Sequence, residues 1–342
     1  MRHINIPIFI PHLGCPNQCV FCNQRSISGV NRFEADKVDE IIRDALSTVE
    51  DDTEVEIAFF GGSFTGIDRS LMIYLLDTAY EYIKSGRASG IRCSTRPDYI
   101  NAEILEILKS RGVKVIELGL QSSSDTVLTR CKRGHDFECE RRACRMIAEA
   151  GLELVGQMMI GLPGSDPESE LKCAEFIVSS GAVAARIYPT VVFKDTELCQ
   201  MAADGEYTPI SVEEAVERSA KVFRLFLENN IDVIRIGLCS SENLLSNDNY
   251  FAGPNHPALG EIVLNRYYLE KILEGVNSLA LTDEDILIIK VAPGRLSSAI
   301  GQKKRNKLIL SERLPVKKII FSEDECLTGY SVECEMGELK CT

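Results

Sequence analysis

The sequence predicts an α/β fold, with a partial (β/α)6 barrel followed by a small α+β unit at the C-terminal end. Six short runs rich in β-branched and aromatic residues alternate with helical patterns over the first two thirds of the chain. The candidate chemical motifs follow directly after these runs, at the strand ends where parallel α/β sheets place their functional groups. These two observations agree, and together they favour a barrel.

Each predicted strand ends in a glycine, a proline or a small-residue turn. The six strands are residues 4–10, 55–60, 90–94, 113–119, 154–160 and 183–188. Helical patterns lie between them, at residues 38–49, 69–84, 101–110, 137–150 and 168–179. Such a series of βα units predicts a parallel sheet with its helices outside.

After residue 190 the regular alternation stops. A helix is expected over residues 211–229, followed by the apolar stretch IDVIRIGL, an irregular segment and a second helix over 261–274. A strand, a helical segment and a strand are expected within residues 285–324. We therefore expect a barrel over 1–240, an extension over 241–280 and a separate C-terminal unit over 281–342.

Composition narrows the class of protein. The 342 residues are 45% hydrophobic and 26% charged, as in an ordinary globular protein. No apolar run is long enough to span a bilayer, and the N-terminal segment does not have the pattern of a signal peptide, so we expect a cytoplasmic protein without membrane contact. Thirteen cysteines in a chain of this kind indicate reduced thiols and a metal site rather than disulfides. Cys326, Cys334 and Cys341 are widely spaced and stay unassigned.

One cysteine triplet is tightly spaced. Cys15, Cys19 and Cys22 form the pattern C-x3-C-x2-C in the loop after the first predicted strand. Thiolates are soft ligands that suit iron–sulfur clusters or zinc. A structural zinc site would need a fourth ligand, for which His12 is the nearby candidate. Three ligands on a cubane cluster would leave one iron open.

The triplet, with Phe21 directly before its third cysteine, resembles the signature of the radical S-adenosylmethionine (SAM) superfamily. The resemblance implies a [4Fe-4S] cluster on Cys15, Cys19 and Cys22, with SAM bound at the open iron and Phe21 among the cofactor-binding residues. It also implies that an external donor reduces the cluster, and that SAM is then cleaved to a 5′-deoxyadenosyl radical.

Three strand-end segments extend this resemblance. Gly61, Gly62 and Ser63 resemble the superfamily's GGE-type motif, which implies contact with the methionyl amino group, although serine stands where glutamate is usual. ELGLQS resembles the fourth-strand motif, which implies cofactor contacts for Glu117 and Gln121; a core hydrogen bond is the alternative for Glu117. GQMMIGLPG resembles the fifth-strand segment behind the adenine, which implies roles for Gln157 and Ile160.

Several longer segments are similar to the radical SAM part of the Elongator catalytic-subunit family. They are STRPDYI, ELGLQSSSDTVL with CKRGHD, GQMMIGLPGSD, ARIYPTVVFKDTEL and GPNHPALGE. The resemblance suggests Lys194 and His256 as catalytic candidates, and an RNA substrate such as tRNA. Arg96 and Asp98 are expected to have structural roles, in a salt bridge, a cap or a turn. The chain ends about 80 residues after GPNHPALGE, so we expect no acetyltransferase domain of the Elongator type. The resemblance therefore does not imply that this chain carries out the acyl-transfer step of that family.

The C-terminal unit reverses the sign of the charge. The chain has a formal net charge of −13, yet residues 290–318 hold nine Lys or Arg and one acid. Within this stretch, Ile300–Lys304 resembles the G-x-x-G turn of KH-type RNA-binding modules, with Lys304 in place of the second glycine. Cations near a helix start favour phosphate. The predicted RNA-binding residues are Lys303, Lys304, Arg305 and Lys307.

The leading hypothesis is therefore a radical SAM enzyme that modifies RNA. The first alternative is a radical SAM oxidoreductase acting on a small molecule, as in the oxygen-independent coproporphyrinogen dehydrogenase relatives. The second alternative is an RNA-binding protein with a structural metal site.

Overall fold

A computed structural model describes residues 2–10, 14–15, 19–22, 33–50, 52–238 and 249–337. The chain forms two compact units. The first comprises Met1–Ser211 and Leu225–Pro257, and the second comprises Val212–Arg224 and Ala258–Thr342. The domain limits expected at 240 and 280 stay a prediction. Within the described residues, no helix is both long and apolar enough to cross a membrane.

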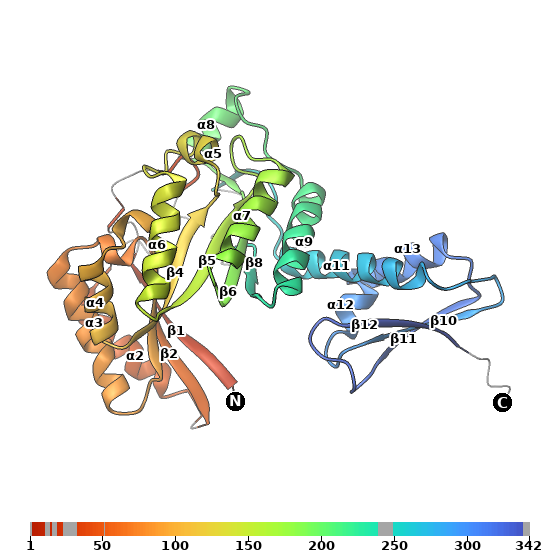
Figure 1. Ribbon diagram of the computed structural model, residues 1–342, viewed down its shortest axis with the longest axis horizontal. Helices are drawn as coiled ribbons and strands as arrows, with labels where there is room; N and C mark the ends of the chain where they lie inside the picture. The colour runs from red at the N-terminus through yellow and green to blue at the C-terminus, as the bar shows by residue number, and fades with distance from the viewer. Residues whose placement is uncertain are drawn as a thin grey trace. The chain divides into compact units, whose positions relative to one another are not determined.

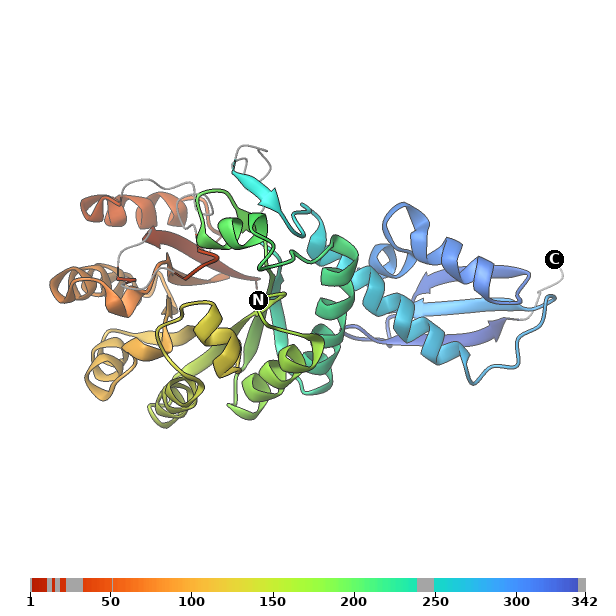
Figure 2. The ribbon, with the colours of Figure 1, turned by 90° about the horizontal axis from the view of Figure 1, so that it is seen from above.

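The first unit is built on a seven-stranded sheet with the order β1-β2-β3-β4-β5-β6-β8. Every neighbouring pair in it is parallel. The strands are β1 (Arg2–Ile10), β2 (Thr53–Gly61), β3 (Gly90–Thr95), β4 (Val113–Gln121), β5 (Glu153–Ile160), β6 (Ala184–Pro189) and β8 (Asp232–Ile236). The sheet curls into part of a barrel (Figure 2), which confirms the predicted fold class.

Helices cover the convex side of this sheet (Figures 1 and 2). They are α2 (Val38–Leu46), α3 (Arg69–Lys84), α4 (Ala102–Ser110), α6 (Phe137–Glu149) and α7 (Pro167–Ser179). Two short helices, α5 (Asp125–Arg130) and α8 (Glu197–Ala203), lie instead at the end of the sheet toward which β4 points (Figure 1). Several begin at a side chain that accepts a hydrogen bond from a free backbone N–H of the first turn. Asp68, Asn101, Asp136 and Asp166 fill this role for α3, α4, α6 and α7. The strand-to-helix turns are thereby fixed at the edge that carries the motifs.

The seventh strand, β8, was not predicted. It lies in IDVIRIGL and pairs with β6 across a long excursion of the chain. None of its residues is fully buried. An edge strand of this kind lacks the continuous buried run that marks the central strands of a parallel sheet, so the sequence signal is weak.

Side chains alternate along the strands between the helix-covered face and the concave face. In β1, Ile6, Ile8 and Ile10 are each about 2% exposed and pack beneath the helices. On the other face His3 contacts Glu56 of β2, at 3.0 Å between Nε2 and Oε2. The concave face therefore carries polar and charged side chains.

The first unit also contains a short antiparallel pair. β7 (Val192–Phe193) lies beside β9 (Tyr250–Ala252). The two segments come from either side of the residues that form β8. Their pairing brings the TVVFKD and GPNHP segments close to each other.

The second unit is an α+β structure, as predicted. Its sheet has the order β11-β10-β12, with β10 parallel to β11 and antiparallel to β12. Its elements are α11 (Leu259–Val276), β10 (Ile286–Val291), α12 (Leu296–Ile300), α13 (Arg305–Arg313), β11 (Lys318–Glu323) and β12 (Val332–Gly337). The residues of helix α9 (Val212–Glu228) up to Arg224 also belong to this unit. Phe223 of α9 packs edge-on against Tyr267 and Tyr330, with ring centroids 5.2 Å apart in each pair.

Candidate functional site

The cysteine loop follows β1 and lies against the end of β2. Gly14 enters it with φ +79°. A Cβ at this position would lie 2.4 Å from the Ser63 carbonyl oxygen and 2.5 Å from backbone atoms of Gly66 and Ile67. Only glycine allows so close an approach of two backbone segments with a left-handed φ. The loop is thus held at the carboxyl end of the sheet, as the sequence predicted for this motif.

The middle of the loop is fixed by backbone and apolar contacts. The Val20 N–H donates to the carbonyl of Cys131, and the Leu198 N–H donates to the carbonyl of Val20. The Val20 side chain is 1% exposed in a cluster that includes Val127, Leu162 and Leu198, and Phe21 packs against this cluster. The aromatic residue before the third cysteine therefore serves here as an anchor for the loop.

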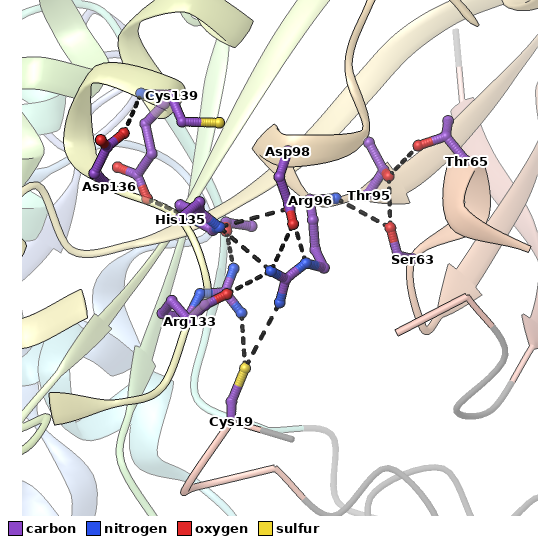
Figure 3. Close-up of polar contacts among 12 residues, drawn as sticks. Cys19, Ser63, Thr65, Thr95, Arg96, Asp98, Arg133, His135, Asp136 and Cys139 are labelled. Carbon is purple, nitrogen blue, oxygen red and sulfur yellow. Dashed lines mark hydrogen bonds and ion pairs between the residues drawn. The ribbon is translucent and has the colours of Figure 1, made fainter. Parts of the chain in front are cut away.

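The three cysteines differ in exposure. Cys19 is buried, whereas Cys15 and Cys22 are half-buried. Burial raises the pKa of Cys15, while a hydrogen bond with the Ser63 backbone and the charge of Arg96 act in the opposite direction. Cys19 itself lies beside two guanidinium groups, those of Arg96 and Arg133 (Figure 3).

The donor set fits an iron–sulfur cluster. Thiolates are the usual ligands of such clusters, and nearby N–H donors stabilise their charge. Among the residues the structure describes, no three His, Cys, Asp or Glu side chains converge as a single metal ion requires. Cys15, Cys19 and Cys22 would hold such a cluster through their thiolates. His12, the alternative zinc ligand, lies outside the described residues.

A chain of buried polar groups extends from Arg96 away from the cysteines. Arg96 donates from Nε and Nη2 to the two carboxylate oxygens of Asp98, at 2.9 Å each, so the two side chains form a salt bridge within the protein. His135 lies between Asp98, 3.5 Å from Nδ1, and Glu140, 3.1 Å from Nε2. Burial raises the pKa of Glu140 to about 7, against the effect of its hydrogen bond with His135. Burial opposes protonation of His135, but hydrogen bonds with Asp98 and Glu140 raise its pKa overall.

The Gly61–Gly62–Ser63 segment lies between the cysteine loop and β3. The Gly62 N–H donates to the Ile10 carbonyl at 2.9 Å. Ser63 is 1% exposed, and its hydroxyl lies 2.9 Å from Thr95 Oγ1 and accepts from the Arg96 N–H at 3.4 Å. The serine side chain is therefore engaged within the protein. What this segment presents outward is the half-buried backbone of its two glycines.

Glu117 lies in an ion-pair network on the concave face. Its carboxylate is 3.1 Å from Arg92 Nη1 and 2.8 Å from Arg186 Nε. Arg92 also pairs with Glu56, 2.6 Å away. The exposed fractions of the side chains of Arg92, Glu117 and Arg186 are 11%, 2% and 14%. The network joins strands β2, β3, β4 and β6, so the core alternative for Glu117 has direct support, and its cofactor contact stays a prediction.

Gln121 and Gln157 meet at the ends of β4 and β5. Gln121 is 5% exposed and has φ 73°, a left-handed conformation that costs a non-glycine residue about 1–2 kcal/mol. Gln157 Nε2 donates to Gln121 Oε1 at 3.4 Å. Strain at a strand end that carries a motif is typical of a ligand-binding position. Ile160 is fully buried, and its carbonyl accepts hydrogen bonds from the N–H and hydroxyl of Thr190.

Lys194 and His256 both lie next to the β7–β9 pair. The Lys194 N–H donates to the Asn249 carbonyl, directly beside the strands. His256 follows β9 by four residues and is half-buried. The fold thus brings these two catalytic candidates into one region of the first unit, and their catalytic roles stay predictions.

The four predicted RNA-binding cations lie together in the second unit. Lys303, Lys304 and Arg305 are exposed, and Lys307 is half-buried at the start of α13. Lys303 and Lys304 have φ 53° and 61°, a left-handed conformation that glycine adopts more readily than lysine. Buried Asn306 donates to the Asn265 and Ala299 carbonyls, at 2.7 and 3.1 Å, and so fixes the turn.

Sequence reasoning did not single out Arg133, Arg92 or Arg186. Arg133 lies in the CKRGHD segment, and the family resemblance of that segment was the one sequence signal that pointed to this residue. Arg92 and Arg186 occur at inward positions of predicted strands. A charged residue inside an apolar strand is an indication of a buried pair.

Two family models match the chain. A model of the radical SAM superfamily matches residues 9–177, and one described as a radical SAM C-terminal domain matches residues 183–269.

Relatives and solved structures show the same similarity. The tRNA uridine(34) acetyltransferase of Methanocaldococcus jannaschii is 29% identical over 184 residues, covering 48% of this chain and 34% of that protein. Human Elongator complex protein 3 is 25% identical over 192 residues, covering 50% and 35%. The chain thus spans about a third of the length of these curated relatives. The structure of the archaeal Methanocaldococcus infernus Elp3 protein, with an N-terminal deletion, matches with a TM-score of 0.63 at 22% identity, over 79% of this chain and 63% of that one.

Proposed function

The chain belongs to the radical SAM superfamily and is a radical SAM enzyme, and we propose that it modifies RNA, with a tRNA-like substrate. Cys15, Cys19 and Cys22 would hold a [4Fe-4S] cluster, and SAM would bind beside this cluster. When bound, the reduced cluster supplies the electron that cleaves SAM to a 5′-deoxyadenosyl radical. The observation that supports this cofactor site is the cysteine loop, held at the carboxyl end of the sheet with guanidinium donors beside Cys19.

The chain's own residues orient SAM at the same edge. The backbone of Gly61 and Gly62 receives the methionyl group, because the Ser63 hydroxyl is already engaged with Thr95 and Arg96. Gln121 and Gln157 offer amide groups at the ends of the next strands. Lys194 and His256, which lie next to the β7–β9 pair, are the residues we propose to contact the substrate. An external reductant supplies the electron.

An RNA substrate is supported by the second unit and by the relatives. Two of the matched relatives are a tRNA uridine acetyltransferase and a subunit of the Elongator complex. The exposed turn around Lys303 and Lys304 carries a local excess of positive charge on an acidic chain. Phosphate contacts supply most of the affinity of such surfaces for RNA.

The substrate class is tested by comparing modified nucleosides. RNA from cells with and without the gene is digested and analysed by mass spectrometry. We expect one or more modified nucleosides to disappear from the tRNA fraction of the deletion strain, and to return with the intact gene but not with a Cys19→Ala gene. Identical profiles in all strains would refute the RNA substrate and would favour a small-molecule substrate.

The basic turn is tested by combining Lys303→Ala, Lys304→Ala and Arg305→Ala. We expect the affinity for total tRNA to fall by about 100-fold at 0.1 M salt, because each phosphate contact contributes a salt slope of about 0.7 to 0.9. In a plot of the logarithm of affinity against the logarithm of salt concentration, the line should become less steep by about 2. Fluorescence anisotropy with labelled total tRNA measures both quantities.

A matched control removes the same charge from helix α6, by combining Arg141→Ala, Arg142→Ala and Arg145→Ala. All three are exposed. This variant should keep the affinity and the salt slope of the unaltered protein. Equal losses of affinity in both variants would show that tRNA binding depends on the net charge of the protein rather than on the turn.

A further inference from the structure

Cys19 lies beside two buried guanidinium groups from distant parts of the chain (Figure 3). Arg133, from the turn between α5 and α6, donates from Nη1 to Cys19 Sγ at 3.2 Å. Arg96, at the end of β3, points its Nη1 at the same sulfur from 3.9 Å. The exposed fractions of Arg133 and Arg96 are 5% and 4%. Both donors are therefore shielded from water.

Other contacts fix the direction of each guanidinium. Arg133 donates from Nη2 to the Gly119 carbonyl at 2.5 Å. Arg96 is held by both carboxylate oxygens of Asp98 and also donates to the Arg133 carbonyl. A planar guanidinium with this many fixed bonds has little freedom to turn away. The donors are thus arranged before any cofactor binds.

The charges around Cys19 do not balance within the protein. Asp98 neutralises Arg96. In the described part of the chain, Arg133 pairs with no carboxylate, and its buried Nε has no hydrogen-bond partner. A buried cation without an anion is costly. A neutral thiol at Cys19 would leave that cost in place, whereas a cluster-bound thiolate supplies the missing negative charge.

We propose that Arg133, with Arg96, donates to the Cys19 thiolate of the cluster and raises the reduction potential of that cluster. The inference rests on the proposed cluster site and adds a positioning role that the sequence motifs did not assign. A fixed positive charge and N–H donors at a cluster sulfur favour the reduced state, which carries one more negative charge. The arginines thereby ease the delivery of an electron from the external donor.

The test is a redox titration of the anaerobically reconstituted full-length chain, followed by electron paramagnetic resonance of the reduced cluster. In Arg133→Met the guanidinium is lost, and we expect the midpoint potential to shift to a more negative value. Arg133→Lys keeps a charge but not the fixed fork, and we expect a smaller shift in the same direction. If Arg133→Met does not retain iron, the potential is measured on Arg133→Lys instead.

A variant with the opposite sign separates this role from structural damage. Asp98→Asn removes the negative charge that offsets Arg96, so its cluster should titrate at a more positive potential. Arg218→Met, which removes a buried guanidinium that pairs with Glu214 on helix α9, should leave the potential unchanged.

Two outcomes remain distinguishable. If the unaltered chain assembles a cluster and both Arg133 variants show the same midpoint potential as that chain, the inference is overturned and the proposed function stays intact. Failure of the unaltered chain to assemble any four-iron cluster would instead refute the proposed function.

Discussion

Replacing Cys19 with alanine should abolish cluster assembly and the reductive cleavage of SAM. Cys19 is the buried member of the triplet and the one that both guanidiniums approach. Loss of an outer partner of a metal site typically costs 10- to 100-fold in affinity or activity, so loss of a ligand should cost more than about 100-fold. Iron and sulfide per chain, and 5′-deoxyadenosine formed after reduction with dithionite, measure the two effects.

The control for this variant is Cys139→Ala on helix α6. Cys139 is half-buried, and its sulfur lies 3.7 Å from Arg142 Nη2. This variant should hold a normal amount of iron and form 5′-deoxyadenosine at the normal rate. A Cys19→Ala protein with full iron content would show that the triplet does not bind the cluster.

Replacing Glu117 with alanine should lower the free energy of unfolding by about 3–5 kcal/mol, because removing one partner leaves buried charges without compensation. The carboxylate serves two arginines, Arg92 and Arg186, whose side chains are 11% and 14% exposed. Urea unfolding followed by circular dichroism measures the change.

A solvent-exposed ion pair provides the comparison. Asp77→Ala removes the partner of Arg111 between helices α3 and α4, where the aspartate side chain is 56% exposed. Such pairs are worth less than about 1 kcal/mol. If Glu117 instead served only to bind SAM, Glu117→Ala would unfold like the unaltered protein and lose only cofactor affinity. The two roles are therefore separable.

Much of the first unit follows from local sequence patterns. The central strands are largely buried and rich in β-branched and aliphatic residues, which makes runs such as VKVIELGLQ easy to recognise, and the helices between them begin at capping aspartates and asparagines. Strand β8 lacks this pattern because it lies at the sheet edge with every residue at least partly exposed. Strand β12 has no fully buried residue and lies after the last strand that was expected, within residues 285–324.

The site was predictable where a motif is local, and not where it depends on the fold. The triplet lies within eight residues, so its chemistry is evident from spacing. Arg133 reaches Cys19 from 114 residues away, and no pattern around it predicts that contact. Likewise, Glu117 pairs with Arg92 and Arg186, which lie 25 and 69 positions away in the sequence. A comparison of short motifs does not detect such distant partners, and it therefore suggested a cofactor contact for Glu117.

The two backbone hydrogen bonds of Val20 have a consequence for folding. They join the cysteine loop to the segment after α5 and to the start of α8, so closing the loop also closes two other loops at the sheet edge. Ordering of these three segments is then one cooperative event. A ligand that binds only the closed arrangement stabilises all of it, by an amount that grows with the logarithm of ligand concentration over its dissociation constant. A cluster on the three cysteines would thus act as a cross-link of the barrel edge, and its loss would increase protease cleavage at α5 and α8 as well as at the cysteines.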